Sequence, residues 1–146
     1  SVVTLLRWRK EPATRLMSLY FPMFPLDLTD LLRRHLSANT NLELQAALHI
    51  ASKLCAAGSF MHSRCVLHRD LKPRNILMRR CESQSGSAAR RSHSPVAQLW
   101  CPVICDFGNA GRLAPQTRNL PTRRYCTLQY CAPEVLMPFM AYAWPS

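Results

Sequence analysis

The sequence predicts an α+β fold with several short strands and two helices. Short apolar runs bounded by polar or proline-containing segments are typical of strands, and the chain contains five of them. Apolar residues that recur every three or four positions are typical of helices packed on one side, and two segments show this spacing. The apolar runs lie at 2–6, 16–21, 65–67, 76–78 and 103–105, and the helical segments at 28–36 and 42–61.

The first two strands are predicted on either side of a charged turn. Apolar residues 2–6 and 16–21 flank the charged, proline-containing stretch 7–15. Pro22 and Pro25 then interrupt the strand, because proline has no amide hydrogen to donate to a neighbouring strand. We therefore expect an extended connector after the second strand.

The two helices are predicted from their apolar spacing. The first begins near Leu28 and ends before residues 39–41. The second carries one apolar stripe, as in a helix packed against a core. This stripe consists of Leu42, Ala46, Ile50, Leu54 and Ala57. The three later apolar runs predict strands, followed by a turn-rich stretch to about residue 131.

Composition narrows the class of protein. A chain of 146 residues forms one domain or part of a larger one, and its 48% hydrophobic content excludes a wholly disordered protein. No apolar stretch reaches the roughly 18 residues of a membrane span. The 19 Lys and Arg outnumber the 8 Asp and Glu, which makes a nucleic-acid-binding module one hypothesis. The nucleic-acid hypothesis is weak, because the Arg residues are scattered along the sequence and form no basic helix.

The seven cysteines and one cationic segment lead to further expectations. The closest cysteine pairs lie at 101/105 and 126/131, with no paired His. We expect free, buried thiols in a reducing compartment, with a zinc site as the alternative. Residues 79–98 are rich in Arg and Ser, so we expect a disordered insert there. Its Ser94-Pro95 pair fits a proline-directed phosphorylation site.

Three motifs contain the residues that can support chemistry. They are the loop His68-Arg-Asp-Leu-Lys-Pro-Arg-Asn75, the tripeptide Asp106-Phe-Gly108 and the tripeptide Ala132-Pro-Glu134. Phosphoryl transfer needs a carboxylate to orient the attacking hydroxyl, a cation for developing charge and oxygen ligands for Mg²⁺. Asp70 and Lys72 can supply the carboxylate and the cation. Asn75 and Asp106 can supply the oxygen ligands.

The order and context of these motifs resemble those of the eukaryotic protein kinase family, of the Ser/Thr type and similar to the cyclin-dependent and mitogen-activated group. The resemblance implies a partial protein-kinase-like α+β fold, with two N-lobe strands and the hinge followed by the mainly helical C-lobe. It assigns residues 1–24 to the N-lobe, as its fourth and fifth strands and hinge, and residues 25–146 to the C-lobe. Within the C-lobe it implies a catalytic loop at 68–75, a disordered insert at 79–98 and an activation segment at 106–134.

The resemblance also implies catalytic roles. Asp70 resembles the Asp that accepts the proton of the substrate hydroxyl, and Lys72 matches the Ser/Thr kinase residue that faces the γ-phosphate. Asn75, a further catalytic position, and Asp106 resemble the two Mg²⁺ ligands. Thr127 resembles a regulatory threonine that hydrogen-bonds both the catalytic Asp and this Lys.

ATP and Mg²⁺ are the cofactors that the resemblance implies. Phe21 stands at the gatekeeper position, and Met23 and Phe24 belong to the hinge segment that meets adenine. Leu77 resembles the apolar residue beneath the adenine ring. Asp106 belongs to the same nucleotide site.

Regulation and partners follow from the same resemblance. Arg69 resembles the cation that binds an activation-loop phosphate, and Thr122 lies where cyclin-dependent kinases carry their activating threonine. His68 resembles a structural, packed histidine. The implied partners are a protein substrate and an activating kinase or regulatory subunit, with no nucleic acid and no membrane. The implied location is intracellular, in the cytoplasm or nucleus.

Departures from the family pattern leave an alternative open. Kinases cover the nucleotide phosphates with a Gly-rich loop and pair a strand Lys with a helix Glu. The four glycines of this sequence form no such loop, and Lys10 lies only eleven residues before Phe21. We therefore expect the chain to be the middle of a kinase domain that transfers no phosphate by itself. The alternative is a pseudokinase-like or truncated, non-catalytic binding module.

Overall fold

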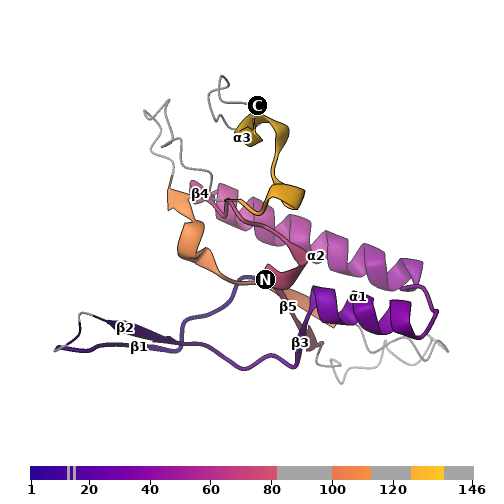
Figure 1. The fold of residues 1–146 in the computed structure, drawn as a ribbon, viewed down its shortest axis with the longest axis horizontal. Helices are drawn as coiled ribbons and strands as arrows, with labels where there is room; N and C mark the ends of the chain where they lie inside the picture. The colour runs from indigo at the N-terminus through magenta and orange to yellow at the C-terminus, as the bar shows by residue number, and fades with distance from the viewer. Residues whose placement is uncertain (13, 15, 82–99, 113–125, 137–146) are drawn as a thin grey trace, which may run out of the picture.

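The computed structural model describes residues 1–12, 14, 16–81, 100–112 and 126–136. A hairpin, a small sheet and two main helices make up most of this structure (Figure 1). The strands are β1 (Arg7–Lys10), β2 (Met17–Tyr20), β3 (Leu26–Asp27), β4 (Val66–Leu67), β5 (Ile76–Arg80), β6 (Trp100–Ile104) and β7 (Gly111–Arg112). The helices are α1 (Leu28–Ser37), α2 (Leu44–His62) and α3 (Pro133–Leu136), with 3-10 turns at Pro73–Asn75, Phe107–Asn109 and Leu128–Tyr130.

β1 and β2 form an antiparallel hairpin that projects away from the helices (Figure 1). Arg7 pairs with Tyr20, and every residue of both strands is exposed. The prediction of a strand at 2–6 was wrong, because β1 begins inside the predicted turn. The reason is that Val2 forms a parallel bridge with Ile104, so the first apolar residues pair with the buried end of β6 and not with β2.

β3, β5 and β6 form an antiparallel sheet with β5 in the centre. β5 and β6 pair from Ile76 opposite Ile104 to Arg80 opposite Trp100. α1 contacts β3 and β5, and α2 contacts β6. The buried apolar side chains form two clusters between these elements. One contains Leu26, Leu31, Ile50, Ile76 and Met78, and the other contains Ala57, Met61 and Ile104.

Both predicted helices are confirmed, with small changes at their ends. α1 begins after Asp27, whose Oδ1 accepts a hydrogen bond from the amide of Asp30 at 2.9 Å, as an N-cap residue does. The predicted stripe of α2 faces the core, and Met61 extends it by a further turn. Among the described helices, none is long and apolar enough to cross a membrane.

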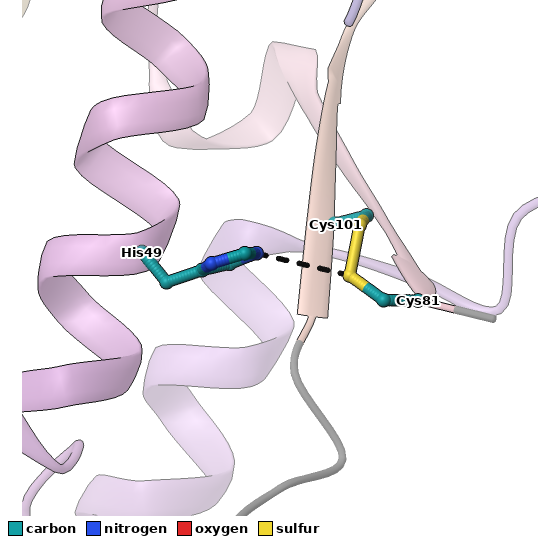
Figure 2. Close-up of side chains that lie close together, drawn as sticks. All are labelled: His49, Cys81 and Cys101. Carbon is teal, nitrogen blue, oxygen red and sulfur yellow. Dashed lines mark hydrogen bonds between the residues drawn. A yellow bond between two sulfur atoms is a disulfide. The ribbon is translucent and has the colours of Figure 1, made fainter. Parts of the chain in front are cut away.

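The end of β5 corrects the predicted boundary of the insert. The last two residues of β5 pair with β6, and Cys81 then forms a disulfide with Cys101 (Figure 2). The prediction of disorder from residue 79 was therefore wrong at this end, because hydrogen bonds to β6 order these polar residues without apolar burial. Residues 82–98 of the insert, including Ser94, lie outside the described residues.

The cysteines differ from the predicted free, buried thiols. Two disulfides are present, Cys81–Cys101 and Cys126–Cys131. The three free cysteines are exposed or half-buried, and they are Cys55, Cys65 and Cys105. The first disulfide has 20 residues of sequence separation, and the β5–β6 pairing brings its two Cα atoms to 5.2 Å. Sequence spacing could not show this proximity.

β4 and β7 form a short antiparallel pair that the sequence did not predict. Leu67 lies opposite Gly111, and Val66 lies opposite Arg112. β4 leads directly into the loop 68–75, and β7 follows the Asp106-Phe-Gly108 tripeptide. The pairing therefore places the segment that follows this tripeptide beside the entry to the polar loop.

Candidate active site

The loop 68–75 connects β4 to β5 and has a constrained backbone. Arg69 has a φ angle of 65°, in the left-handed region that non-glycine residues rarely adopt. Such a conformation costs on the order of 1–3 kcal/mol, so neighbouring bonds must hold it. The loop ends in the 3-10 turn Pro73–Asn75, in which the amide of Asn75 donates to the carbonyl of Lys72 at 2.9 Å. Pro73 favours the start of this turn because its φ is already fixed.

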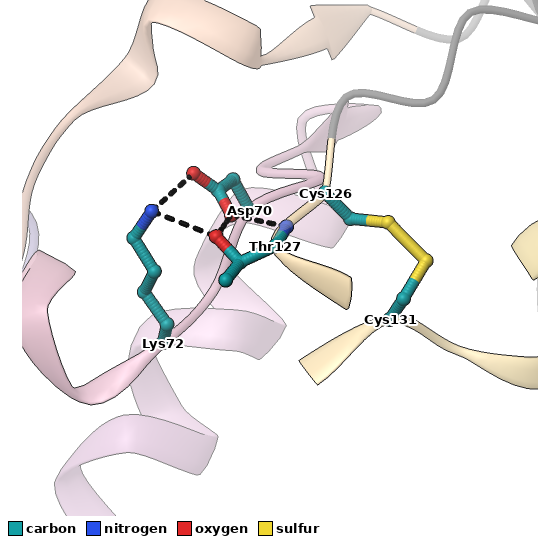
Figure 3. Close-up of a disulfide and its surroundings, with 5 residues drawn as sticks. All are labelled: Asp70, Lys72, Cys126, Thr127 and Cys131. Atoms are coloured by element: carbon teal, nitrogen blue, oxygen red, sulfur yellow. Dashed lines mark hydrogen bonds and ion pairs between the residues drawn. A yellow bond between two sulfur atoms is a disulfide. The ribbon is translucent and has the colours of Figure 1, made fainter. Parts of the chain in front are cut away.

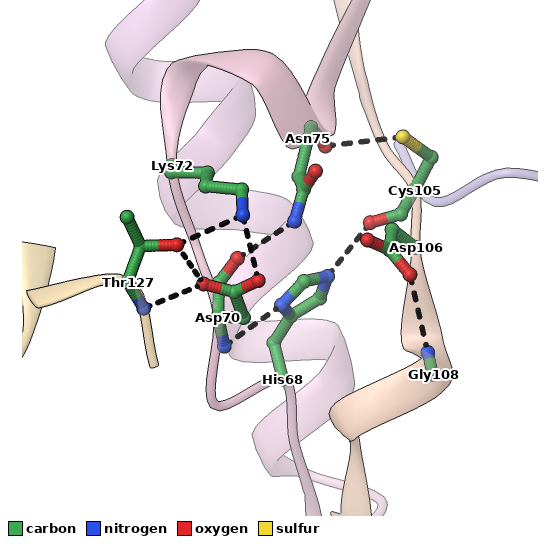
Figure 4. A network of polar contacts seen from close by, with 8 residues as sticks. All are labelled: His68, Asp70, Lys72, Asn75, Cys105, Asp106, Gly108 and Thr127. Atoms are coloured by element: carbon green, nitrogen blue, oxygen red, sulfur yellow. Dashed lines mark hydrogen bonds and ion pairs between the residues drawn. The ribbon is translucent and has the colours of Figure 1, made fainter. Parts of the chain in front are cut away.

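Asp70, Lys72 and Thr127 form one hydrogen-bonded network (Figure 4). Lys72 Nζ lies 2.9 Å from Asp70 Oδ2 and 2.8 Å from Thr127 Oγ1. Asp70 Oδ1 accepts hydrogen bonds from the Thr127 amide at 3.0 Å and from the Thr127 hydroxyl at 2.8 Å. Thr127 and Asp70 are 57 positions apart in the sequence, so the fold brings them together.

This network keeps the Asp70 side chain ionised. That side chain is only 8% exposed, and burial by itself raises the pKa of a carboxyl group. Hydrogen bonds from Lys72 and Thr127, together with the positive charge of Lys72, outweigh burial and hold the pKa of Asp70 below its usual value. At neutral pH, Asp70 is therefore a carboxylate that can accept a further hydrogen bond.

We expect Thr127→Val to raise the pKa of Asp70, because valine removes the hydroxyl that donates to Oδ1. A carboxylate with a lowered folded-state pKa contributes stability above its unfolded-state pKa, about 3.9 for Asp, and that stability is lost as pH falls through the folded-state pKa. The stability difference between Thr127→Val and the wild type should therefore be present at neutral pH and shrink below about pH 4. Carboxyl-carbon NMR titration and urea denaturation at several pH values measure both effects.

The matched control is Thr29→Val, which makes the same change on α1, outside this network. It should leave the pKa of Asp70 unaltered. An unaltered Asp70 pKa in Thr127→Val would contradict the assigned role of the hydroxyl.

His68 connects the loop to the end of β6. Its side chain is buried, and Nε2 lies 2.8 Å from the carbonyl oxygen of Cys105. Nδ1 accepts a hydrogen bond from the Asp70 amide at 3.4 Å, which leaves Nε2 to carry the ring proton and donate it to Cys105. The ring also packs edge-on against Phe107, with centroids 4.9 Å apart. His68 therefore helps to fix the backbone of Asp70 relative to the end of β6.

Asn75 and Asp106 lie on segments joined by backbone hydrogen bonds. The amide of Cys105 donates to the Asn75 carbonyl at 3.0 Å, and Asn75 Nδ2 donates to the Asp70 carbonyl at 2.9 Å. Because this second bond uses the side-chain nitrogen of Asn75, the side-chain oxygen is the atom that can bind a cation. Asp106 has a φ angle of 62°, and its exposed carboxylate accepts a hydrogen bond from the Gly108 amide at 3.4 Å.

The donor set at Asn75 and Asp106 suits a magnesium ion. Carboxylate and amide oxygens are hard ligands, which Mg²⁺ prefers, and Mg²⁺ binds through few protein ligands and substrate phosphates. Within the described part of the chain, Asp106 takes part in no ion pair, so no Lys or Arg neutralises its charge there. These two residues therefore fit the ligand role that the sequence predicted for them.

The thiol of Cys105 stays protonated at neutral pH. Burial raises its pKa, and the carboxylates of Asp106 and Asp27 raise it further. The thiol donates to the Asn75 carbonyl, with Sγ 3.4 Å from the oxygen. A protonated, half-buried thiol is a poor nucleophile, so its surroundings favour a packing and hydrogen-bonding role for Cys105.

Arg69 extends from the loop to the segment after Asp106. Its Nε donates to the carbonyl of Asn109. Gly111 lies so close that a Cβ placed there would be 2.9 Å from the guanidinium carbon of Arg69. The absence of a side chain at Gly111 therefore permits this approach. Thr122, the predicted phosphate carrier for Arg69, lies outside the described residues.

The predicted adenine-contacting residues lie on two segments, the connector between β2 and β3 and the strand β5. Phe21 and Met23 are 45% and 97% exposed on the connector after β2, whereas Phe24 is half-buried. This connector enters the sheet through β3, whose Asp27 lies opposite Leu77 of β5. The structure therefore brings the end of the connector beside Leu77.

The second disulfide closes the turn that contains Thr127. Cys126 precedes Thr127, and Cys131 follows the 3-10 turn Leu128–Tyr130 (Figure 3). Sequence reasoning noted the 126/131 spacing but did not connect it with Thr127. It also missed the contacts of Asn109 and Gly111 with Arg69, for which the sequence contains no signal.

Comparisons with known proteins agree with this arrangement. The family described as protein kinase domain matches residues 1–143. The chain is 37% identical over 107 residues to ribosomal protein S6 kinase alpha-4 of Homo sapiens, covering 72% of this chain and 12% of that protein. It is 29% identical over 140 residues to cyclin-dependent kinase B2-1 of Oryza sativa subsp. japonica, covering 93% and 36%. It is 32% identical over 119 residues to a probable cell division protein kinase of Encephalitozoon cuniculi, covering 82% and 30%.

These matches identify the class of the protein as a eukaryotic protein kinase and confirm the predicted protein-kinase-like α+β fold. The chain belongs to the protein kinase family. It spans 12% to 36% of the length of these three relatives.

Proposed function

We propose that this chain provides the catalytic loop and the metal-binding turn of a protein Ser/Thr kinase, which transfers the γ-phosphoryl group of ATP to a hydroxyl of a protein. The observation that supports this function most directly is the network of Asp70, Lys72 and Thr127. It contains an ionised carboxylate and a cation on one short loop, and phosphoryl transfer needs both.

Each member of the network has a distinct proposed role. Asp70 orients the attacking hydroxyl of the substrate and accepts its proton, because its carboxylate is ionised and firmly held. Lys72 places its positive charge near the transferring phosphate and reduces the cost of negative charge that develops there. Thr127 holds both side chains in this geometry through its hydroxyl.

The proposed cofactors are ATP and Mg²⁺. Asn75 and Asp106 would hold Mg²⁺, which neutralises charge on the nucleotide phosphates when it is bound. Phe21, Met23 and Phe24 would contact adenine from the connector, with Leu77 beneath the ring. Residues 1–24 would belong to the N-lobe and residues 25–146 to the C-lobe, with the activation segment at 106–134.

The proposal extends to regulation and partners. Arg69 would bind a phosphate on Thr122 through its guanidinium group, which is strongly suited to phosphate. The partners would be a protein substrate and an activating kinase or regulatory subunit. The protein would act inside the cell, where ATP and Mg²⁺ are abundant.

Removal of the proposed metal ligand tests this function. In the full-length protein, we expect Asp106→Ala to lower kcat/KM for Mg²⁺-dependent phosphorylation of Ser and Thr about 10²–10³-fold, because an electrostatic contributor to the transition state is lost. Transfer of labelled γ-phosphate to a protein substrate measures the rate. Glu43→Ala is the matched control, since Glu43 is an exposed carboxylate with no side-chain cap bond, and it should retain full activity. Undiminished turnover in Asp106→Ala would refute the assignment.

A second candidate function is a non-catalytic binding module. Within these 146 residues, the four glycines form no Gly-rich phosphate loop, so we expect this segment by itself to show no phosphate transfer. In the full-length protein, the two functions differ in outcome: a kinase binds Mg²⁺-ATP and phosphorylates protein, whereas a binding module retains its partner but shows no Asp106-dependent transfer.

A further inference from the structure

One cluster of metal-binding side chains lies away from the catalytic loop. His49 comes from α2, Cys81 follows β5 and Cys101 lies on β6 (Figure 2). One ligand atom from each residue lies within 4.8 Å of the other two, and His49 Nε2 is 3.8 Å from Cys81 Sγ. All three side chains are half-buried. We propose that this cluster is a zinc site when the Cys81–Cys101 disulfide is reduced.

The positions of the three residues suit tetrahedral coordination. Zinc binds sulfur at about 2.3 Å and imidazole nitrogen at about 2.0–2.1 Å, so a tetrahedral site separates N from S by about 3.5 Å and S from S by about 3.8 Å. The Nε2–Sγ separation of 3.8 Å is already close to the first value. The Cα atoms of Cys81 and Cys101, at 5.2 Å, lie near enough for both thiolates to reach one ion by side-chain rotation.

The backbone holds these residues in place before any ion binds. The β5–β6 ladder extends to Arg80 opposite Trp100, directly beside both cysteines. On α2, His49 lies three residues after the buried Ala46, at the edge of the packed face of the helix. α2 also packs against β6. Because these elements are already assembled, a metal ion would need little further ordering of the backbone.

The zinc site would form in two steps, reduction of the disulfide and then binding of the ion. A two-electron reductant breaks the Sγ–Sγ bond, and Cys81 and Cys101 become thiols. A dithiol supplies two electrons and two protons and becomes a disulfide, whereas a phosphine takes the oxygen of one water molecule, becomes a phosphine oxide and leaves the two protons of that water on the thiols. Zinc then displaces both thiol protons to solvent and binds two thiolates and the neutral imidazole of His49. A water molecule would complete four-coordination, because Zn²⁺ accepts three protein ligands and one open position.

Two thiolates and an imidazole favour zinc over magnesium. Soft thiolates select zinc and copper(I), whereas Mg²⁺ prefers oxygen ligands. This site would therefore not compete for the Mg²⁺ of the proposed catalytic centre. Either bridge, disulfide or zinc, joins Cys81 to Cys101, and zinc would add coordination bonds from both cysteines to His49 of α2, where the disulfide form has only the 3.8 Å contact between Cys81 Sγ and His49 Nε2. The proposed zinc site is separate from the catalytic loop and does not depend on kinase activity.

Metal content and cobalt spectroscopy of the full-length protein test the site. After reduction with a non-chelating phosphine and exchange into buffer with Zn²⁺, we expect about one zinc ion per chain that is retained on desalting, and none in the oxidised protein. Co²⁺ in place of zinc should produce a thiolate-to-cobalt absorption band in the near ultraviolet and tetrahedral d–d bands in the visible region. Excess Mg²⁺ should change neither result.

Variants locate the ion. His49→Gln and Cys101→Ser should each weaken zinc binding more than about 100-fold, since even changes outside the coordination shell cost about 10–100-fold. Cys131→Ser is the matched control, because it removes a cysteine of the other disulfide and should retain zinc.

Three results would overturn the site. These are reduced wild-type protein that takes up no zinc and shows no cobalt–thiolate band, His49→Gln that binds zinc as tightly as wild type, and Cys131→Ser that loses zinc as fully as Cys101→Ser. The cobalt spectrum is recorded on the wild type, so the conclusion holds even if one variant fails to fold.

Discussion

Replacement of Asp70 by Asn is expected to lower kcat for protein phosphorylation by the full-length protein about 10³-fold, within the range for loss of a positioned acid–base group. Asparagine has nearly the same shape but no charge. It cannot form the ion pair with Lys72, and its amide cannot accept the substrate proton as a carboxylate does. The KM for ATP should change much less, because the proposed partner of Asp70 is the reacting hydroxyl and not the nucleotide base.

Initial rates at saturating ATP, measured with a protein substrate, test this expectation. Asp30→Asn makes the same change in the first turn of α1 and should retain wild-type activity. Circular dichroism and thermal unfolding of both variants show whether the fold is kept. A folded Asp70→Asn protein with kcat within threefold of wild type would exclude Asp70 as the residue that accepts the substrate proton.

Met78→Ala is expected to destabilise the folded state by roughly 3 kcal/mol, within the range for truncating a buried Met. Met78 is 0% exposed at the centre of β5, between Leu26 on β3 and Pro102 on β6. Alanine leaves a cavity beneath both helices that the rigid ladders on either side cannot close. The loss of contacts and the cavity both reduce the free energy of unfolding.

Urea denaturation of the full-length protein measures this change as a lower midpoint with a similar m value. The matched control is Arg79→Ala, which truncates the exposed neighbour on the same strand and should shift stability by less than about 0.5 kcal/mol. Equal midpoints for Met78→Ala and wild type would show that the sheet centre is not the core.

Local patterns in the sequence predicted most of the helices and strands. The stripe on α2 was predicted correctly because a helix packed on one side requires apolar residues every three or four positions. The strand at 2–6 was predicted wrongly because an apolar run indicates burial but does not name its partner. Val2 pairs with Ile104, more than a hundred residues away, and the mainly charged strand β1 pairs with β2, which lies in the predicted apolar run 16–21.

In the candidate site too, the sequence predicted which residues take part, and the structure showed which of them meet. The residue types and their order predicted Asp70, Lys72, Asn75 and Asp106 as one chemical set, and the resemblance to the kinase family added Thr127. The structure joins Asp70, Lys72 and Thr127 in one network and places Asp106 next to Cys105, whose amide bonds to Asn75. The roles of these residues in catalysis stay predictions until the variants are measured.

The sequence by itself determined the two long helices, most of the strand segments, the family and the residues able to carry phosphoryl-transfer chemistry, because these depend on local spacing and residue type. Only the tertiary structure decided which distant residues meet. The β5–β6 ladder brings Cys81 to Cys101 and both to His49, and the β4–β7 pair places Arg69 against Gly111. The physical reason is that backbone pairing between distant strands follows the burial of the whole core, and a local pattern contains no information about its partner.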